Sequence, residues 1–252
     1  MGSSFQRTVS IFLACFLCFT QISPISCGEK VSLTLYYESL CPYCSNFIVN
    51  YLPKVFKNGL IDVVDLKLVP WGNTKIQANN TFKCQHGKAE CFLDTVEACA
   101  IDAWPDLNEH FPFIYCVESL VYHKNYTQWE TCFEKLNLKA KLVKDCVGSG
   151  RGKELELRYA AETNALQPPH KYVPWVVVDG QPLYDEYMDF ISYICKAYKG
   201  APVPGCSSTV NVIKMGRKFT PFCLMHTATS KLSTIGSAIT SWMNRVNLAA
   251  SA

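Results

Sequence analysis

The period of the hydrophobic pattern changes near residue 40. Over residues 31–37 apolar side chains occupy every second position, which is typical of a half-buried β-strand. After residue 44 they recur at helical spacing, at Ile48, Tyr51, Leu52 and Val55. Pro53 falls inside this pattern and should kink the predicted helix. Strand-like alternation returns over residues 61–69, so the order predicts a βαβ unit with parallel strands and a right-handed crossover.

The middle of the chain has a different pattern. From about residue 74 to 150, with approximate boundaries, strand-like alternation is absent and six cysteines are separated by short helical patterns. A helix is predicted over residues 153–166 and a strand over residues 173–178, after which Asp179-Gly180 indicates a tight hairpin turn. Asp185 could cap a final helix. This order predicts an α/β protein with a thioredoxin-like fold and an inserted, disulfide-stapled helical subdomain.

The two ends differ from this body. Residues 1–27 have the basic start, apolar centre and small residues of a secretory signal peptide, and their apolar run is too short for a comfortable membrane span. We therefore expect a cleaved signal, a thioredoxin-like domain over residues 29–206 and a tail of unknown role over residues 207–252. The tail has an amphipathic stripe that could dock on the body or lie on a membrane surface, or it is a loosely ordered extension. No other stretch predicts a membrane span.

Composition places the chain in an oxidising compartment. It has 14 cysteines, most of which we expect in disulfides if the chain is exported. Removal of the signal leaves an odd number, so either Cys27 is retained or one thiol, with Cys223 the candidate, is unpaired. Asn79 and Asn125 lie in glycosylation sequons, in agreement with a secretory route to a lysosome, a vacuole or the cell exterior. The net charge of +3 is spread along the chain, which argues against nucleic-acid binding.

The strongest chemical motif is Cys41-Pro42-Tyr43-Cys44, at the predicted junction of strand and helix. Unpaired amides and the dipole at a helix N-terminus stabilise a thiolate, which is the species that attacks disulfides. We expect Cys41 to be the exposed nucleophile with a lowered pKa and Cys44 to be the buried resolving thiol. A purely structural disulfide is the weaker alternative, because so short a loop gains little from closure. A zinc site would need a second ligand pair that the sequence lacks, so no metal is expected.

Val173 and Pro174 form the second element of the predicted site. In a thioredoxin-like domain a cis proline packs opposite the CxxC motif, and the backbone of the residue before it pairs with substrate peptide. Pro174 directly precedes a buried strand, as this arrangement requires. We therefore predict that Val173 and Pro174 bind substrate.

A longer motif makes a family resemblance specific. Cys84-Gln85-His86-Gly87, followed by Glu90, Cys91 and Cys99, resembles the signature CQHG-x₂-EC-x₂-N-x₄-C of the gamma-interferon-inducible lysosomal thiol reductase (GILT) family. Seven of its eight fixed positions are present. The departure is Asp94, where the family has Asn; a carboxylate there would reverse the role of a donating amide. The resemblance covers roughly residues 29–206.

The resemblance implies a soluble thiol reductase that opens disulfides of protein substrates in acidic compartments or outside the cell. It implies no metal or organic cofactor, so an external small thiol must reset the enzyme. The three signature cysteines, Cys84, Cys91 and Cys99, are interpreted as disulfide partners. His86 and Glu90 are interpreted as hydrogen-bonded structural groups, although a position near the active site is the alternative.

Three functions are compatible with these residues. The leading hypothesis is a thiol-disulfide oxidoreductase that acts as a reductase through Cys41 and Cys44. A thiol oxidase or isomerase on the same fold differs in redox potential, which sequence does not provide. A non-enzymatic, disulfide-rich secreted binding glycoprotein is the alternative from another class.

Overall fold

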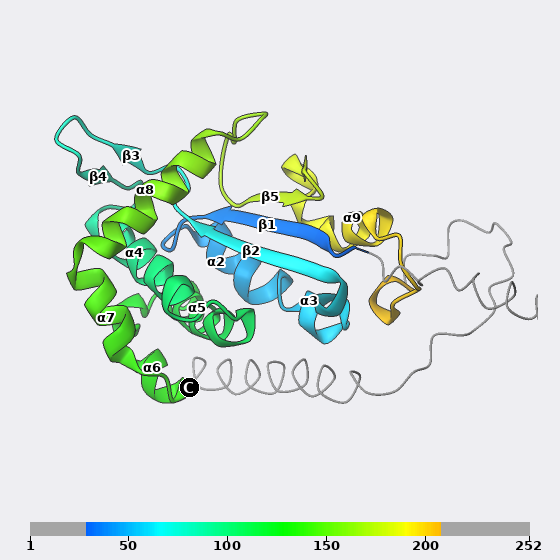
Figure 1. Cartoon of the computed structure of the whole chain (residues 1–252), viewed down its shortest axis with the longest axis horizontal. Helices are drawn as coiled ribbons and strands as arrows, with labels where there is room; N and C mark the ends of the chain where they lie inside the picture. Colours follow the sequence, from blue (N-terminus) through cyan, green and yellow to red (C-terminus); the bar gives the residue numbers. More distant parts are fainter. Residues whose placement is uncertain (1–28, 208–252) are drawn as a thin grey trace, which may run out of the picture.

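The computed structural model describes residues 29–207. The predicted signal peptide and, apart from Ser207, the predicted tail lie outside the described residues, as do Cys27 and Cys223. Figure 1 shows the sheet beside a lobe of helices, with α9 near the end of the sheet that lies away from that lobe.

A four-stranded sheet with the order β2-β1-β5-β6 forms the centre of the fold. Strand β1 (Val31–Tyr37) pairs in parallel with β2 (Val64–Pro70) and antiparallel with β5 (Trp175–Val178). The sequence predicted all three strands. Strand β6 (Gln181–Pro182) returns through the predicted turn, in which Asp179 and Gly180 both have positive φ.

The connection between β1 and β2 is helical but broken, as predicted. It consists of α2 (Pro42–Asn46), a π-helical turn (Phe47–Tyr51), α3 (Lys54–Lys57) and a 3₁₀ turn (Leu60–Val63). The break falls at Leu52 and Pro53, where a proline cannot supply the next backbone donor.

The insertion is mainly helical. Its helices are α4 (Lys88–Ala103), α5 (Leu107–Tyr122), α6 (Thr131–Leu136) and α7 (Ala140–Gly148), with a 3₁₀ turn (Tyr126–Gln128) after α5. The helix predicted after the insertion is α8 (Gly150–Asn164). The predicted absence of strands is wrong at one place, because β3 (Lys75–Ile76) and β4 (Phe82–Lys83) form a short hairpin. These strands have two residues each and lie largely on the surface, too short for a periodicity to emerge.

The end of the domain corrects one predicted cap. Asp185 lies within a 3₁₀ turn (Tyr184–Asp189), and α9 (Phe190–Ala197) follows Asp189 without a side-chain cap. A further 3₁₀ turn (Pro204–Cys206) completes the described chain. The residues before α9 already form a helical turn that contains Asp185, so the Asp185 side chain cannot cap the first amides of α9.

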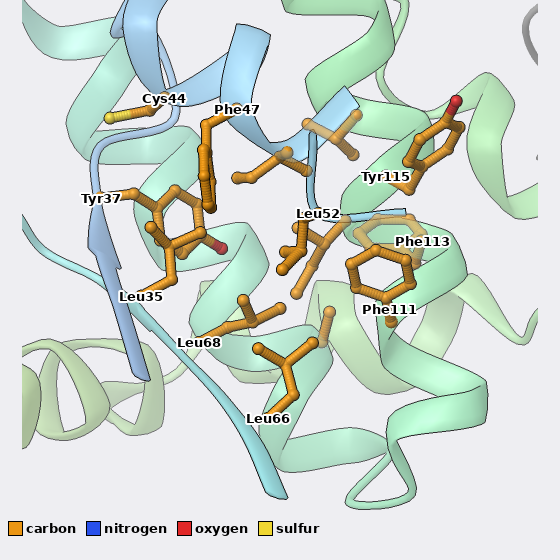
Figure 2. Close-up of a cluster of buried hydrophobic side chains, with 14 of the residues drawn as sticks. Leu35, Tyr37, Cys44, Phe47, Leu52, Leu66, Leu68, Phe111, Phe113 and Tyr115 are labelled. Atoms are coloured by element: carbon orange, nitrogen blue, oxygen red, sulfur yellow. The ribbon is translucent and has the colours of Figure 1, made fainter. Parts of the chain in front are cut away.

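One hydrophobic core joins the sheet to the insertion. Figure 2 shows side chains from β1 and β2 packed against the broken helix and against α5: Leu35, Tyr37, Leu66, Leu68, Phe47, Leu52, Phe111, Phe113 and Tyr115. The insertion is therefore part of the same packed unit and can hold residues rigidly against the sheet.

Four disulfides staple the described chain. Three lie within the insertion, namely Cys84–Cys91, Cys99–Cys146 and Cys116–Cys132. The fourth, Cys195–Cys206, ties α9 to the segment after it. The interpretation of the signature cysteines as disulfide partners is confirmed. Cys41 and Cys44 are the free cysteines among residues 29–207.

Candidate active site

Cys41 and Cys44 lie where β1 leads into the broken helix. Cys41 occupies the N-cap position of α2 in an extended conformation, and Pro42 begins the helix. The fixed φ of proline suits a first helical position, and its missing N–H would have no partner there. Cys44 lies one turn later with 0% exposure, at the edge of the core beside Phe47 (Figure 2).

The two thiols have opposite acidities. A hydrogen bond from the Cys44 thiol lowers the pKa of Cys41 to about 6; burial opposes this shift, and the amides of Cys44 and Tyr43 and the charge of His86 support it. Burial raises the pKa of Cys44 well above its usual value, and the hydrogen bond and charge of Cys41 add to that shift. The arrangement stabilises a thiolate on Cys41 and keeps a proton on Cys44.

The expected exposure of the Cys41 sulfur is corrected by the structure. Cys41 is only 5% exposed, whereas the neighbouring Tyr43 is 66% exposed. Cys41 instead lines an open cleft of about 760 Å³. A substrate disulfide would reach Cys41 by entering this cleft, so shape can select substrates in a way that a protruding thiol could not.

Val173 and Pro174 lie where the sequence predicted. Their peptide bond is cis, and Pro174 is followed directly by β5. Val173 lines the cleft, and its carbonyl oxygen lies 3.9 Å from Cys41 Sγ. The two sequence motifs, 132 residues apart, therefore meet at one point.

Residues of the family signature also line the cleft. Gln85 and His86 line it, and His86 Nδ1 is hydrogen-bonded to the Glu90 carboxylate. The other Glu90 oxygen accepts the His86 backbone N–H at 2.9 Å. Gly87 has a φ of 92° and begins α4, a conformation that favours glycine. His86 and Glu90 are thus hydrogen-bonded to each other, as predicted, and His86 also lines the cleft that contains Cys41.

Glu38 is a site residue that sequence analysis missed. It is fully buried, and its Oε2 lies 3.6 Å from His86 Nδ1. Its Oε1 accepts the Asn73 backbone N–H at 2.5 Å, and Gly72 leaves room for it because a β-carbon there would clash with the Glu38 side chain. The available signal was an acidic residue at the end of an apolar strand, three positions before the CxxC motif.

Burial and the neighbouring charges shift the pKa of His86 in opposite directions. Burial lowers the pKa of His86, but the hydrogen bond and charge of Glu90 and the charges of Glu38 and Cys41 raise it overall. Burial raises the pKa of Glu38 to about 7; the charge of Glu90 contributes, and the Asn73 amide and the His86 charge oppose the shift. In an acidic medium this arrangement favours a charged His86 beside a neutral Glu38.

Asp94, the departure from the signature, also supports the site. Its Oδ1 accepts the Ser39 backbone N–H at 2.8 Å and so ties α4 to the loop before Cys41. Burial raises the pKa of Asp94 well above its usual value, and the charge of Glu156 adds to this. The side chain at this position accepts a hydrogen bond, and the amide oxygen of an Asn side chain can accept the same bond.

Two groups of side chains have the spacing of metal ligands. Glu38, His86 and Glu90 offer atoms within 4.8 Å of one another, as do Cys84, Glu90 and Asp94. The first set is engaged in its own hydrogen bonds and ion pair, and Cys84 is bonded to Cys91. The absence of a metal stays a prediction.

Comparisons with known proteins agree with the resemblance found in the sequence. Residues 32–136 match the family model described as gamma interferon inducible lysosomal thiol reductase. A gamma-interferon-responsive lysosomal thiol protein of Arabidopsis thaliana is 42% identical over 218 residues, covering 84% of this chain and 91% of that protein. The gamma-interferon-inducible lysosomal thiol reductase of Carassius auratus is 34% identical (71% and 73% covered), and that of Mus musculus is 32% identical (77% and 78% covered).

Solved structures show the fold. Reduced DsbA from Mycobacterium tuberculosis superposes with a TM-score of 0.51 at 18% identity, covering 74% of this chain and 90% of that one. DsbA from Chlamydia trachomatis gives 0.50 at 14% identity, covering 67% and 86%. The predicted thioredoxin-like α/β class is confirmed. Within residues 29–207 no helix is both long and apolar enough to cross a membrane.

Proposed function

Because this chain belongs to the gamma interferon inducible lysosomal thiol reductase family, we propose that Cys41 and Cys44 are the redox pair with which it reduces disulfide bonds. The protein is a thiol-disulfide oxidoreductase, and family membership overturns the alternative of a non-enzymatic binding glycoprotein. The observation that carries the assignment is the asymmetry of the pair. An acidified thiol faces the cleft, and a fully buried partner with a raised pKa lies one turn behind it.

The reaction proceeds in two exchanges. The Cys41 thiolate attacks one sulfur of the substrate disulfide, so a Cys41–substrate bond forms and the substrate S–S bond breaks. Cys44 then loses its proton and attacks Cys41 Sγ, which releases the second substrate sulfur and leaves a Cys41–Cys44 disulfide. Two electrons pass to the substrate. Two equivalents of an external small thiol reduce the pair again and leave as their own disulfide.

His86 is suited to handle protons in this cycle. The first substrate sulfur leaves as a thiolate in the cleft that His86 lines, and a protonated imidazole can donate to it. Glu90 holds Nδ1, so the opposite ring nitrogen is free of that contact. The proton lost by Cys44 neutralises the second substrate thiolate, and His86 regains a proton from water. His86 is thus a proposed acid, with Glu90 and Glu38 as positioning residues.

Val173 is proposed to position the substrate chain. Its carbonyl is already within reach of Cys41 Sγ, and it lies at the start of the segment that leads into β5. A substrate backbone that pairs with Val173 would bring its disulfide to the cysteine. Pro174 lacks a backbone N–H, so a backbone donor to the substrate at this point is supplied by Val173 and not by Pro174.

The proposal also covers the compartment, the glycosylation sites and the partners of this reaction. The relatives named above are described as lysosomal, which supports a lysosome, a vacuole or the cell exterior as the compartment. Asn79 and Asn125 are exposed and suit N-linked glycans. Protein substrates, a small-thiol donor and independence from metals and organic cofactors complete the proposal.

Cys44→Ser tests the pair directly. Without a resolving thiol, the variant should accumulate mixed disulfides between Cys41 and a disulfide-containing protein, visible on non-reducing gels and released by dithiothreitol. Cys41→Ser should form none and lose turnover. Trapped adducts in Cys41→Ser, or turnover that survives it, would contradict the assignment.

A further inference from the structure

Three lysines lie around the cleft. Lys75 and Lys83 come from the β3–β4 hairpin, and Lys171 comes from the segment before Val173. All three are exposed, and with Cys41 and His86 they line the same cavity. No Asp or Glu lines this cavity among the described residues. We call these three residues the lysine rim.

The arrangement of the lysine rim is unfavourable for the protein alone. Lys75 and Lys83 are register partners in the antiparallel hairpin, and like charges directly opposite each other destabilise a strand pair. Neither they nor Lys171 take part in any ion pair within residues 29–207. Other exposed lysines in that region, such as Lys57, Lys139 and Lys153, also have no ion pair, but the rim brings three lysines to one cavity without a carboxylate. The lysine rim is therefore a group of cations without an internal counter-charge.

From this we infer that the lysine rim binds carboxylates that flank the substrate disulfide, so that acidic peptide segments are the preferred substrates. The inference rests on the proposed function, because it takes the cleft at Cys41 as the substrate site. The rim lines the same cleft as Cys41 and Val173, which is where the residues next to a bound disulfide would lie. Asn73 and Gln85 line the same cleft and add neutral hydrogen-bonding groups.

The charges persist in an acidic compartment. Lysines are fully protonated there, and substrate Asp and Glu side chains remain mostly ionised at pH 5.5, about one unit or more above their usual pKa values. His86 adds positive charge in the same range, since Glu90 and Glu38 raise its pKa. Rim charges of this kind mainly increase the rate of association and are screened by salt. We expect an effect of about threefold to tenfold on the rate of reduction.

The test uses three disulfide peptides that differ only in the residues beside the disulfide, which are Glu, Gln or Lys. Pre-reduced full-length protein reduces each peptide in a single turnover at pH 5.5 and low salt, without any thiol donor. Each rate is divided by the rate with dithiothreitol to remove intrinsic differences between the disulfides. The expected order is Glu, then Gln, then Lys, with the differences shrinking in 0.5 M salt.

Variants then assign the preference to the lysine rim. The triple variant K75Q/K83Q/K171Q should reduce the three peptides at similar rates. The matched control K57Q/K139Q/K153Q removes three exposed lysines outside the cleft and should keep the wild-type preference. Equal wild-type rates on all peptides, or a preference that survives in the rim variant, would overturn the inference and leave the redox function intact. Failure of the wild-type protein to reduce any peptide would reject the redox function as well.

Discussion

Cys41 and Cys44 are three residues apart, yet one thiol is acidified and the other holds its proton. The helix position anticipated from sequence contributes through the amides of Cys44 and Tyr43, but the largest cause is the hydrogen bond from the Cys44 thiol. With a pKa of about 6, about 9% of Cys41 is thiolate at pH 5, against about 0.03% for an ordinary thiol. Because nucleophilicity falls as the pKa falls, the net rate gain is about 20-fold. Acid-active reduction is thus physically accessible to this site.

His86 makes a prediction at the same scale. His86→Gln should lower the rate of disulfide reduction at pH 5 by about tenfold or more, because the leaving thiolate loses its acid. It should also remove the part of the pH–rate profile that falls as His86 loses its proton. The measurement is single-turnover reduction of one peptide between pH 4.5 and 8.

The control for this variant is His123→Gln, which changes an exposed histidine after α5 that does not line the cleft. A purely structural role for His86 predicts a lower rate with an unchanged pH profile. That outcome would reject His86 as an acid.

At the scale of elements, the disulfides divide into those that hold the fold and one that holds the site. Cys99–Cys146 ties α4 to α7 across 47 residues, whereas Cys84–Cys91 closes seven residues. The short loop contains Gln85, His86 and Glu90, two of which line the cleft. Cys99–Cys146 therefore stabilises the fold mainly by closing a long loop. Cys84–Cys91 closes a short loop and mainly constrains the residues that line the cleft.

Removal of each bridge should separate these roles. Replacing Cys99 and Cys146 by Ala should lower the free energy of unfolding by about 4 kcal/mol, and replacing Cys84 and Cys91 by Ala by about 2 kcal/mol, from loop-closure entropy. Reduction activity should fall further in the second variant, because His86 and Glu90 lose their constraint. Urea unfolding and peptide reduction measure the two effects. The prediction fails if activity follows stability in both variants.

At the scale of the whole molecule, four buried carboxyl groups come from α5 and α8 and from α4, which packs against both. Asp94 and Glu97 come from α4, Glu118 from α5 and Glu156 from α8, and none exceeds 2% exposure. Burial raises the pKa of Glu97 to about 8, although a hydrogen bond from Tyr37 opposes the shift. Burial raises the pKa values of the other three well above the ordinary range. These groups are compatible with the fold while they carry protons.

This burial predicts a protein that is more stable in acid. Below about pH 3.5, which is under the usual pKa values of Asp and Glu, these carboxyls are mostly protonated in both states, so their stabilising contribution is present. As the pH rises towards 8, the unfolded chain releases protons that the folded chain retains, and each group lowers the free energy of unfolding by up to about 1.4 kcal/mol per pH unit. The urea midpoint should be higher at pH 5 than at pH 8. Oxidised protein should be used, since the lowered pKa of Cys41 acts in the opposite direction.

Asp94→Asn provides a specific check. Asn keeps the acceptor for Ser39 and does not titrate, so the stability of the variant relative to the wild type should increase from pH 5 to pH 8. Asp65→Asn, on the exposed side of β2, is the matched control and should show no such increase. A wild-type midpoint that rises from pH 5 to pH 8 would contradict the whole account.

Local patterns in the chain were enough to identify the thioredoxin-like core and to propose its redox pair. Periodicity predicted β1, β2 and β5, Pro53 predicted the break in the helix, and the CxxC spacing indicated the proposed pair, because each of these signals arises between residues close in sequence. The short β3–β4 hairpin and the misplaced Asp185 cap show the limit, since two-residue strands have no period and a cap depends on where the preceding turn ends.

Long-range packing was needed for the rest. His86 and the lysine rim line one cleft, with Glu38 buried beside His86, because the insertion shares a core with the sheet. The pairings of the eight bridged cysteines follow from the same packing. The acidity of Cys41 and the proton retention of the buried carboxyls depend on burial and on neighbours distant in sequence. Spacing along a chain carries information about neighbours within a few residues, whereas electrostatics depends on distances in space and on the exclusion of water.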